Sequence, residues 1–275
     1  MPGMKHFAGK VAVVTGGASG IGRAIARRLV AEQMTVVIAD IEQRALDTTA
    51  HEIGAVGIRT DVSDPGSMQA LADEVARRYG SVDLFCNNAG VASTAAIADM
   101  TVSDWQWLLG VNVWGVIHGI RSFLPLLKAN ADGGQLVNTS SMSGFHVTPE
   151  LGGYTVSKFA VMALFETLAL ELAAEKSRVG LTILCPGPVS THLGSSQRNR
   201  PDALADGAFI DQDLEALDDG QGLRWMDPAA VADLLMDAIR RGDLYAMTHP
   251  EWASIVRERH ARIETALSRH GHAGT

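Results

Sequence analysis

Apolar residues recur along the chain in two alternating patterns. Short runs rich in Val, Ile, Leu and Ala, of which KVAVVTG at 10–16 is the first, are typical of buried strands. Further runs of this kind lie at 35–40, 55–62, 82–90, 133–141, 179–187 and 243–249. Between them, apolar residues at helical spacing predict helices at 21–33, 42–52, 65–80, 102–128, from Tyr154 onward, and at 228–242. This alternation predicts an α/β fold with a doubly wound parallel sheet of about seven strands and helices on both faces.

Two segments depart from the alternation inside what we interpret as a single domain over residues 1–275. The stretch 191–226 is polar, acidic and without clear periodicity. Because a loop of this length is usually functional, we interpret it as a substrate loop that covers the site, with a disordered surface insertion as the alternative. The tail at about 250–275 is predicted to be helical, and it could pack on its own subunit or cap a neighbour's site. Its apolar residues at helical spacing are Trp252, Val256, Ile263 and Leu267.

Composition narrows the class of protein. The chain is 47% hydrophobic and 20% charged, which is enough to build a full core. The net charge is −8 and there is no basic stripe, which argues against a nucleic-acid surface. The start of the chain has no long apolar segment, and no run of about 18 apolar residues predicts a membrane span. Cys86 and Cys185 lie in apolar runs, so they are predicted to be free thiols in a reduced compartment, the cytoplasm.

A glycine-rich turn follows the first predicted strand. In VVTGGASGIG (13–22), Gly16, Gly20 and Gly22 leave the backbone open at the point where a helix begins. Backbone N–H groups and the partial positive charge of a helix N-terminus can then bind a pyrophosphate. A glycine turn alone is equally consistent with a plain tight turn, but its place at the start of a strand–helix unit favours a dinucleotide site.

Asp40 ends the second predicted strand and bears on the choice of dinucleotide. A carboxylate at this position can accept hydrogen bonds from ribose hydroxyls and repels a 2′-phosphate. Neither Ser19 nor Ile41 offers a cation to that phosphate, so the sequence predicts NAD and not NADP. A solvated aspartate at a strand end is the alternative.

Tyr154 and Lys158 lie four residues apart at the start of a long apolar helix, in GGYTVSK. Residues at this spacing share one face of a helix. A cation close to a phenol favours the phenolate, so this pair could bring the pKa of Tyr154 towards neutrality. Taken alone, the pair is equally compatible with an ordinary surface helix start.

Taken together, the motifs identify the chain as resembling the short-chain dehydrogenase/reductases, over roughly 8–191 plus the last predicted helix and strand. The resemblance is carried by TGGASGIG (15–22), Asp61-Val62, NNAG (87–90), Asn112, Ser141, YTVSK (154–158) and PGPVST (186–191). It implies a Rossmann-type dinucleotide-binding catalytic domain. It also implies the catalytic set Asn112, Ser141, Tyr154 and Lys158, in which Ser141 is chosen by register over its neighbours Ser140 and Ser143.

The same resemblance implies a hydride transfer between a secondary alcohol or ketone and the nicotinamide. Tyr154 would be the general acid/base, Ser141 would hold the substrate oxygen, and Lys158 would hold the nicotinamide ribose. Asn112 would bend its helix and anchor a water. No metal is expected, because the cofactor carries the difficult step. The implied cofactor-binding residues are Thr15, Gly16, Ser19, Gly20, Ile21, Gly22, Asp40, Ile41, Asp61, Val62, Asn88, Ala89, Gly90, Tyr154, Lys158, Pro186, Gly187, Val189 and Thr191.

Apolar residues near the predicted site suggest a hydrophobic or aromatic substrate. The candidate substrate residues are Ser143, Val147, Leu151, Leu193 and Trp225, with Phe209 and Met226 as further apolar walls. His146 and His192 are interpreted as ordinary loop histidines. The alternatives are an NADP-dependent ketone reductase and a non-catalytic dinucleotide-binding scaffold.

The helices around 102–128 and 154–173 are apolar on nearly all sides. Such helices need cover beyond the sheet. The sequence therefore predicts a homodimer or homotetramer in which the same helix of another subunit supplies the cover.

Overall fold

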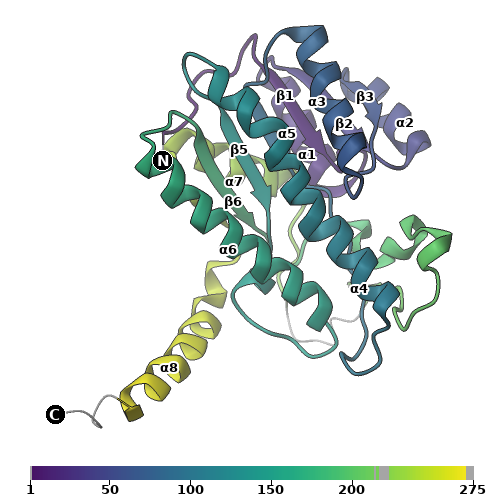
Figure 1. The fold of residues 1–275 in the computed structure, drawn as a ribbon, viewed down its shortest axis with the longest axis vertical. Helices are drawn as coiled ribbons and strands as arrows, with labels where there is room; N and C mark the ends of the chain where they lie inside the picture. Colours follow the sequence, from purple (N-terminus) through teal and green to yellow (C-terminus); the bar gives the residue numbers. More distant parts are fainter. Residues whose placement is uncertain (1, 214, 217–222, 271–275) are drawn as a thin grey trace.

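A seven-stranded parallel sheet forms the centre of the protein, in a computed structural model that describes residues 2–213, 215–216 and 223–270 (Figure 1). The strand order is β3-β2-β1-β4-β5-β6-β7, and each neighbouring pair is parallel. The strands are β1 (Val11–Thr15), β2 (Thr35–Asp40), β3 (Val56–Arg59), β4 (Leu84–Asn87), β5 (Gln135–Thr139), β6 (Gly180–Cys185) and β7 (Tyr245–Met247). The predicted doubly wound, Rossmann-type fold is confirmed.

Both faces of the sheet are covered, which explains why its strands are continuously apolar. Along β1, every side chain is buried. Val13 belongs to a core with Phe85 and Phe123, whose rings stack 4.0 Å apart, while Val14 belongs to a second core on the opposite face with Leu29. The α/β class follows from this two-sided burial.

Two of the helices that cover the sheet begin at an aspartate cap. Asp64 accepts hydrogen bonds from the first turn of α3, and Asp227 caps α7 in the same way, each followed by a proline. The helices are α1 (Gly20–Ala31), α2 (Gln43–Ile53), α3 (Pro65–Tyr79), α4 (Val102–Leu109), α5 (Gly115–Ala129), α6 (Gly152–Ala174), α7 (Pro228–Arg241) and α8 (Ala253–His270). None of the described helices is both long enough and apolar enough to cross a membrane.

The single helix predicted over 102–128 is wrong in one respect, because a π-helical turn at Gly110–Trp114 separates α4 from α5. The side chain of Asn112 accounts for this wide turn. Its amide donates to the Val91 carbonyl at 2.9 Å and to Ser157 Oγ at 3.0 Å, and its oxygen accepts from the Val91 N–H at 2.9 Å. Apolar periodicity alone could not reveal a break that depends on these distant partners.

The described part of the stretch 191–226 packs against α4, and residues 214 and 217–222 lie outside the described residues. It begins with 3₁₀ turns at His192–Asn199 and Asp202–Leu204. Arg200 pairs with Asp104 of α4 at 2.7 Å, and both side chains are buried. For residues 192–213, the alternative of a disordered surface insertion is therefore wrong.

Candidate active site

A cavity of about 510 Å³ lies at the carboxyl ends of β1, β2, β4, β5 and β6. Ligands bind at this edge in open α/β sheets. Of the predicted cofactor residues it is lined by Gly16, Ser19, Gly20, Ile21, Gly22, Asp40, Ile41, Asp61, Val62, Asn88, Ala89, Gly90, Tyr154, Lys158, Pro186, Gly187, Val189 and Thr191. The topology thus brings together motifs that are spread over most of the chain.

Thr15 and Asn112 do not line this cavity, so neither is placed to touch a ligand there. Thr15 is completely buried, and its Oγ1 accepts from the N–H groups of Asn88 and Ala89 at 3.0 and 3.1 Å. Asn112 holds Val91, which does line the cavity. Both residues therefore hold in place the backbone of residues that line the cavity.

The glycine turn brings two backbone segments into close contact. Gly16 has a φ of +64°, and a Cβ at Gly22 would lie 2.1 Å from the Gly16 carbonyl oxygen and 2.5 Å from Asn88 Nδ2. Ser19 begins α1 without a side-chain cap, so the first N–H groups of α1 are left for a ligand. This geometry suits a phosphate group at the N-terminus of α1.

If the cavity binds NAD⁺, as the sequence predicts, Gly22→Ala should weaken that binding by about tenfold or more, because the added methyl forces the turn apart. The measurement is calorimetric titration of the folded variant with NAD⁺. Gly66→Ala is the matched control, since a Cβ there meets no atom closer than 3.4 Å. Equal affinity in the two variants would contradict this account of the turn.

Asp40 is held by backbone donors at the far end of the cavity. Its carboxylate accepts from the N–H groups of Ala18 and Glu42, both at 3.1 Å. Burial raises the pKa of Asp40, and these two hydrogen bonds partly offset that effect. Arg198 also lines this end, where it pairs with Glu42 at 2.9 Å. This cation could not be predicted from sequence neighbours of Asp40, because Arg198 comes from the distant 3₁₀ segment His192–Asn199.

Tyr154 and Lys158 point into the same cavity from the first turns of α6, and both are buried. Lys158 Nζ lies 5.4 Å from the centre of the Tyr154 ring and donates to the Thr139 carbonyl at 3.1 Å. Burial raises the pKa of Tyr154 to about 12 and lowers the pKa of Lys158 to about 8. The predicted lowering of the Tyr154 pKa is not found in this structure, because the effect of burial exceeds that of the Ser141 hydroxyl.

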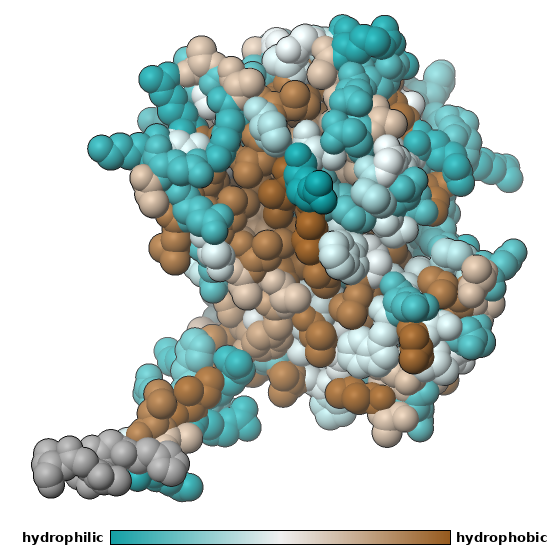
Figure 2. Space-filling view, in the orientation of Figure 1, coloured by the Kyte–Doolittle hydropathy of each residue, from teal (hydrophilic) through white to brown (hydrophobic). Residues whose placement is uncertain are grey.

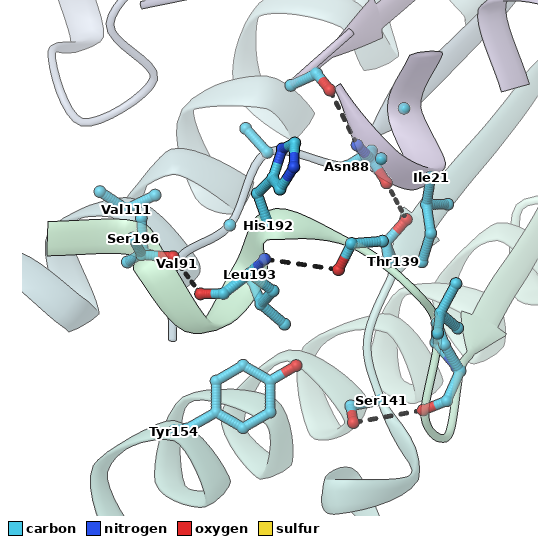
Figure 3. Close-up of a pocket in the computed structure, with 18 of the residues that line it drawn as sticks. Ile21, Asn88, Val91, Val111, Thr139, Ser141, Tyr154, His192, Leu193 and Ser196 are labelled. Carbon is cyan, nitrogen blue, oxygen red and sulfur yellow. Dashed lines mark hydrogen bonds between the residues drawn. The ribbon is translucent and has the colours of Figure 1, made fainter. Parts of the chain in front are cut away.

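Ser141 is the serine whose hydroxyl faces the phenol, as Figure 3 shows. Its Oγ donates to the Pro186 carbonyl at 3.3 Å and accepts from the Ser143 N–H at 3.1 Å. The Ser141 hydroxyl lowers the pKa of Tyr154 against the effect of burial. Ser140 instead donates to the Lys158 carbonyl at 3.4 Å, which favours the register that selects Ser141.

The predicted substrate residues are only partly confirmed as cavity walls. Ser143, Leu151, Leu193 and Trp225 line the cavity. The prediction that Val147 lines the cavity is wrong, because its side chain is 67% exposed. Phe209 and Met226 do not line the cavity either. Phe209 packs against the Trp107 ring, at 5.9 Å between centroids.

Several lining residues were missed or interpreted as ordinary loop residues; they are Trp107, Val111, His146, His192, Leu223 and Trp252. Burial lowers the pKa of His146. Among the described residues, His146 Nε2 and Trp225 Nε1 have no hydrogen-bond partner. The sequence pattern could not identify these lining residues, because five separate segments of the chain supply them.

No group of three or more His, Cys, Asp or Glu side chains in the described part of the chain could hold a metal ion. Cys86 and Cys185 are both buried and free. Burial raises the pKa of Cys185 to about 12, so this thiol is not a ready nucleophile.

Fold and cavity together define a Rossmann-type oxidoreductase. The chain belongs to the short chain dehydrogenase family, whose model matches residues 10–202. That match includes the glycine turn, Ser141, Tyr154 and Lys158.

Three similar proteins cover nearly the whole chain. A short chain dehydrogenase/reductase from Burkholderia phymatum, solved in complex with NAD, is 38% identical, with 96% of this chain and 97% of that chain covered and a TM-score of 0.89. The apo form of LigO from Sphingobium sp. strain SYK-6 is 33% identical, with 98% and 93% covered and a TM-score of 0.81. A C alpha-dehydrogenase from the same strain is 29% identical over 256 residues, 90% of this chain and 83% of that protein.

Proposed function

We propose that this protein is an NAD-dependent oxidoreductase that interconverts hydrophobic or aromatic secondary alcohols and their ketones. The observation that carries the proposal is the Tyr154 hydroxyl facing Ser141, with Lys158 alongside, in the cavity that also contains the glycine turn. The Burkholderia phymatum relative, solved with NAD, supports the choice of cofactor.

The residues of the cavity fit a dinucleotide. A Cβ at Gly16 would lie 2.8 Å from Ala89 Cα, so this side of the turn stays open only with glycine. The N-terminus of α1 would hold the pyrophosphate, and Asp40 the adenosine ribose. When bound, NAD supplies the hydride acceptor or donor at its nicotinamide ring.

The side chains then divide the proton chemistry. During oxidation Tyr154 would act as the phenolate and take the alcohol proton at its Oη, and during reduction the phenol so formed would return that proton. Ser141 donates a hydrogen bond to the substrate oxygen and stabilises the charge that develops there. Lys158, with a pKa of about 8, is mainly an ammonium at pH 7 and favours the phenolate form of Tyr154. Asn112 does not line the cavity; its side chain orients Val91 and Ser157 through hydrogen bonds.

The walls beside Tyr154 indicate the substrate class. Leu151, Leu193, Trp107 and Trp225 are apolar or aromatic and come from separate segments. A ring-bearing or aliphatic alcohol can bury its carbon skeleton against them. The likeness to a C alpha-dehydrogenase supports a dehydrogenation at carbon as the reaction.

A coenzyme comparison tests the role of Asp40. We expect kcat/KM for NAD⁺ to exceed that for NADP⁺ by about 100-fold or more, because a carboxylate beside a 2′-phosphate costs several kcal/mol. Asp40→Asn should narrow this ratio, whereas Asp47→Asn, on the exposed face of α2, should leave it unchanged. Equal use of the two coenzymes by the wild-type enzyme would contradict the proposal.

NADP dependence is the second candidate, and Arg198 is the observation that favours it. Its guanidinium lies at the Asp40 end of the cavity. There it forms an ion pair with Glu42 at 2.9 Å, which partly neutralises the charge that a 2′-phosphate would need. If Arg198→Ala removes NADP⁺ activity while leaving NAD⁺ activity intact, this second candidate holds.

We also propose a cytoplasmic homodimer or homotetramer in which α6 faces the same helix of another subunit. Its solvent side exposes Val156 and Leu170, the latter 74% exposed. Figure 2 shows apolar side chains gathered over the region of α5 and α6. The two buried free cysteines are consistent with a reducing compartment.

The experiment that tests the proposed activity is an absorbance screen for reduced nicotinamide with NAD⁺ and a panel of aliphatic and aromatic secondary alcohols. We expect turnover with at least one hydrophobic member. Tight NAD⁺ binding without hydride transfer from any alcohol would favour the non-catalytic scaffold instead.

A further inference from the structure

Helix α8 leaves the body of the protein and projects beyond it (Figure 1). Only its root contacts the body; this root consists of the 3₁₀ turn Pro250–Trp252 and the first turns of α8. Trp252 and Val256 pack against the core, and the Arg259 guanidinium lies 4.9 Å from the centre of the Phe159 ring on α6. From residue 260 to 269 every side chain is exposed. The tail therefore packs on its own subunit only at its root.

The face of α8 that holds this root continues outward without a partner in the described part of the chain. Trp252, Val256 and Arg259 are followed on the same helical face by Ile263 and Leu267. These two side chains are 44% and 69% exposed. Short helices are marginal in water without tertiary packing, so an apolar face that extends beyond the body indicates a further contact surface.

Charge and position indicate a second copy of this chain as the partner. Residues 253–270 contain four arginines and two glutamates, whereas the whole chain carries a net charge of −8. The helix is therefore basic while the chain as a whole is acidic, so a second copy of the chain would attract the helix electrostatically. Its root lies against α6, whose exposed Val156 and Leu170 form the surface on which we propose assembly. In a two-fold assembly, each copy would extend α8 across the other.

We propose that α8 is an assembly arm that packs Ile263 and Leu267 on a second copy of this chain, next to α6. The arm also reaches the active site at its root. Trp252 lines the cavity and packs against His146 and His249, at 5.2 and 5.7 Å between ring centroids. Seating the arm on a neighbour fixes this wall of the cavity. The inference rests on the proposed self-assembly and not on the proposed hydride transfer.

Sedimentation velocity over a range of concentrations tests the arm. The double variant Ile263→Glu with Leu267→Glu places two charges on the apolar face. Ala261→Glu with Thr265→Glu places the same two charges on the opposite, exposed face. We expect the first pair to raise the dissociation constant of the assembly about tenfold or more above that of the control pair. Equal dissociation constants, or a wild-type protein that stays monomeric at every concentration, would overturn the proposal.

A labelling experiment with Leu267→Cys gives a second reading, because Cys86 and Cys185 are buried. We expect the rate of maleimide labelling at position 267 to fall as the protein concentration rises through the range of assembly. A rate independent of assembly would overturn the proposal. Neither experiment uses substrate or cofactor, so failure of the alcohol screen leaves these outcomes unchanged.

Discussion

Tyr154→Phe is expected to lower kcat/KM for the best alcohol by about 10²–10⁴-fold, the range that general acid–base catalysis contributes. The variant removes one oxygen from a buried ring and leaves the glycine turn and Asp40 in place. NAD⁺ affinity, measured by calorimetric titration, should therefore stay near the wild-type value. The separation between lost turnover and retained binding is what distinguishes a proton-transfer role from a structural one.

The chain provides a matched control for this variant. Tyr245 also carries a phenol, but it is 36% exposed on β7 and donates to Glu166 at 2.7 Å. Tyr245→Phe should retain nearly full turnover. If Tyr154→Phe retains as much activity as Tyr245→Phe, the assignment of the general acid/base is wrong.

The pH dependence of the reaction should reflect the ionisation of Tyr154 and Lys158. Burial raises the pKa of Tyr154 to about 12 and lowers that of Lys158 to about 8. Lys158 is charged below its pKa of about 8, and in that state it stabilises the phenolate of Tyr154. Oxidation needs the phenolate of Tyr154, which a rising pH favours, together with the Lys158 cation, which is lost as the pH rises through about 8. A profile of kcat/KM against pH should therefore rise and then reach an upper limit once Lys158 loses its charge.

Arg200→Met is expected to lower the free energy of unfolding by about 3–5 kcal/mol, because it leaves Asp104 as a buried charge without its partner. The Asp104 side chain is completely buried, and it also accepts from the N–H groups of Thr101 and Ala208 at 2.8 and 3.0 Å. Urea unfolding measures the change. Because the Arg200 guanidinium lies 5.4 Å from the Trp107 ring, and Trp107 lines the cavity, KM for the alcohol should also rise.

Arg77→Met is the control for the buried pair. Arg77 and Glu74 form a surface pair, with the Arg77 side chain 69% exposed, and such pairs contribute about 0–1 kcal/mol. A similar small loss for Arg200→Met would contradict a structural role for the buried pair.

Acid should reduce the difference between Arg200→Met and the wild-type protein. Burial raises the pKa of Asp104, but hydrogen bonds from Ala208, Thr101 and Arg200 more than offset it, so that the pKa of Asp104 lies below its ordinary value. The stability gained from this carboxylate is full above its ordinary pKa and is lost as pH falls through the depressed value.

Local patterns were sufficient to predict the sheet, because each strand carries its own apolar run and the helices between them carry apolar residues at helical spacing. The glycine turn and the Tyr154–Lys158 pair were predictable for the same reason. Chain topology then placed them in one cavity, since the carboxyl ends of parallel strands share an edge.

Features that depend on distant partners could not be predicted in this way. The π-helical turn at Asn112 depends on Val91 and Ser157, and Arg198 reaches Glu42 from the substrate loop. Val147 was assigned to the cavity because it is apolar and close in sequence to Ser143. The structure exposes it, because apolar character does not determine the direction of a loop side chain.

Label transfer from an alcohol tests the central claim most directly. A hydrophobic secondary alcohol carrying deuterium on its carbinol carbon would be mixed with NAD⁺ and an excess of enzyme for a single turnover. The account predicts that the deuterium is recovered in the reduced nicotinamide with the wild-type protein and far more slowly with Tyr154→Phe. Transfer at the same rate by both proteins, or no transfer from any alcohol by a protein that binds NAD⁺, would contradict it.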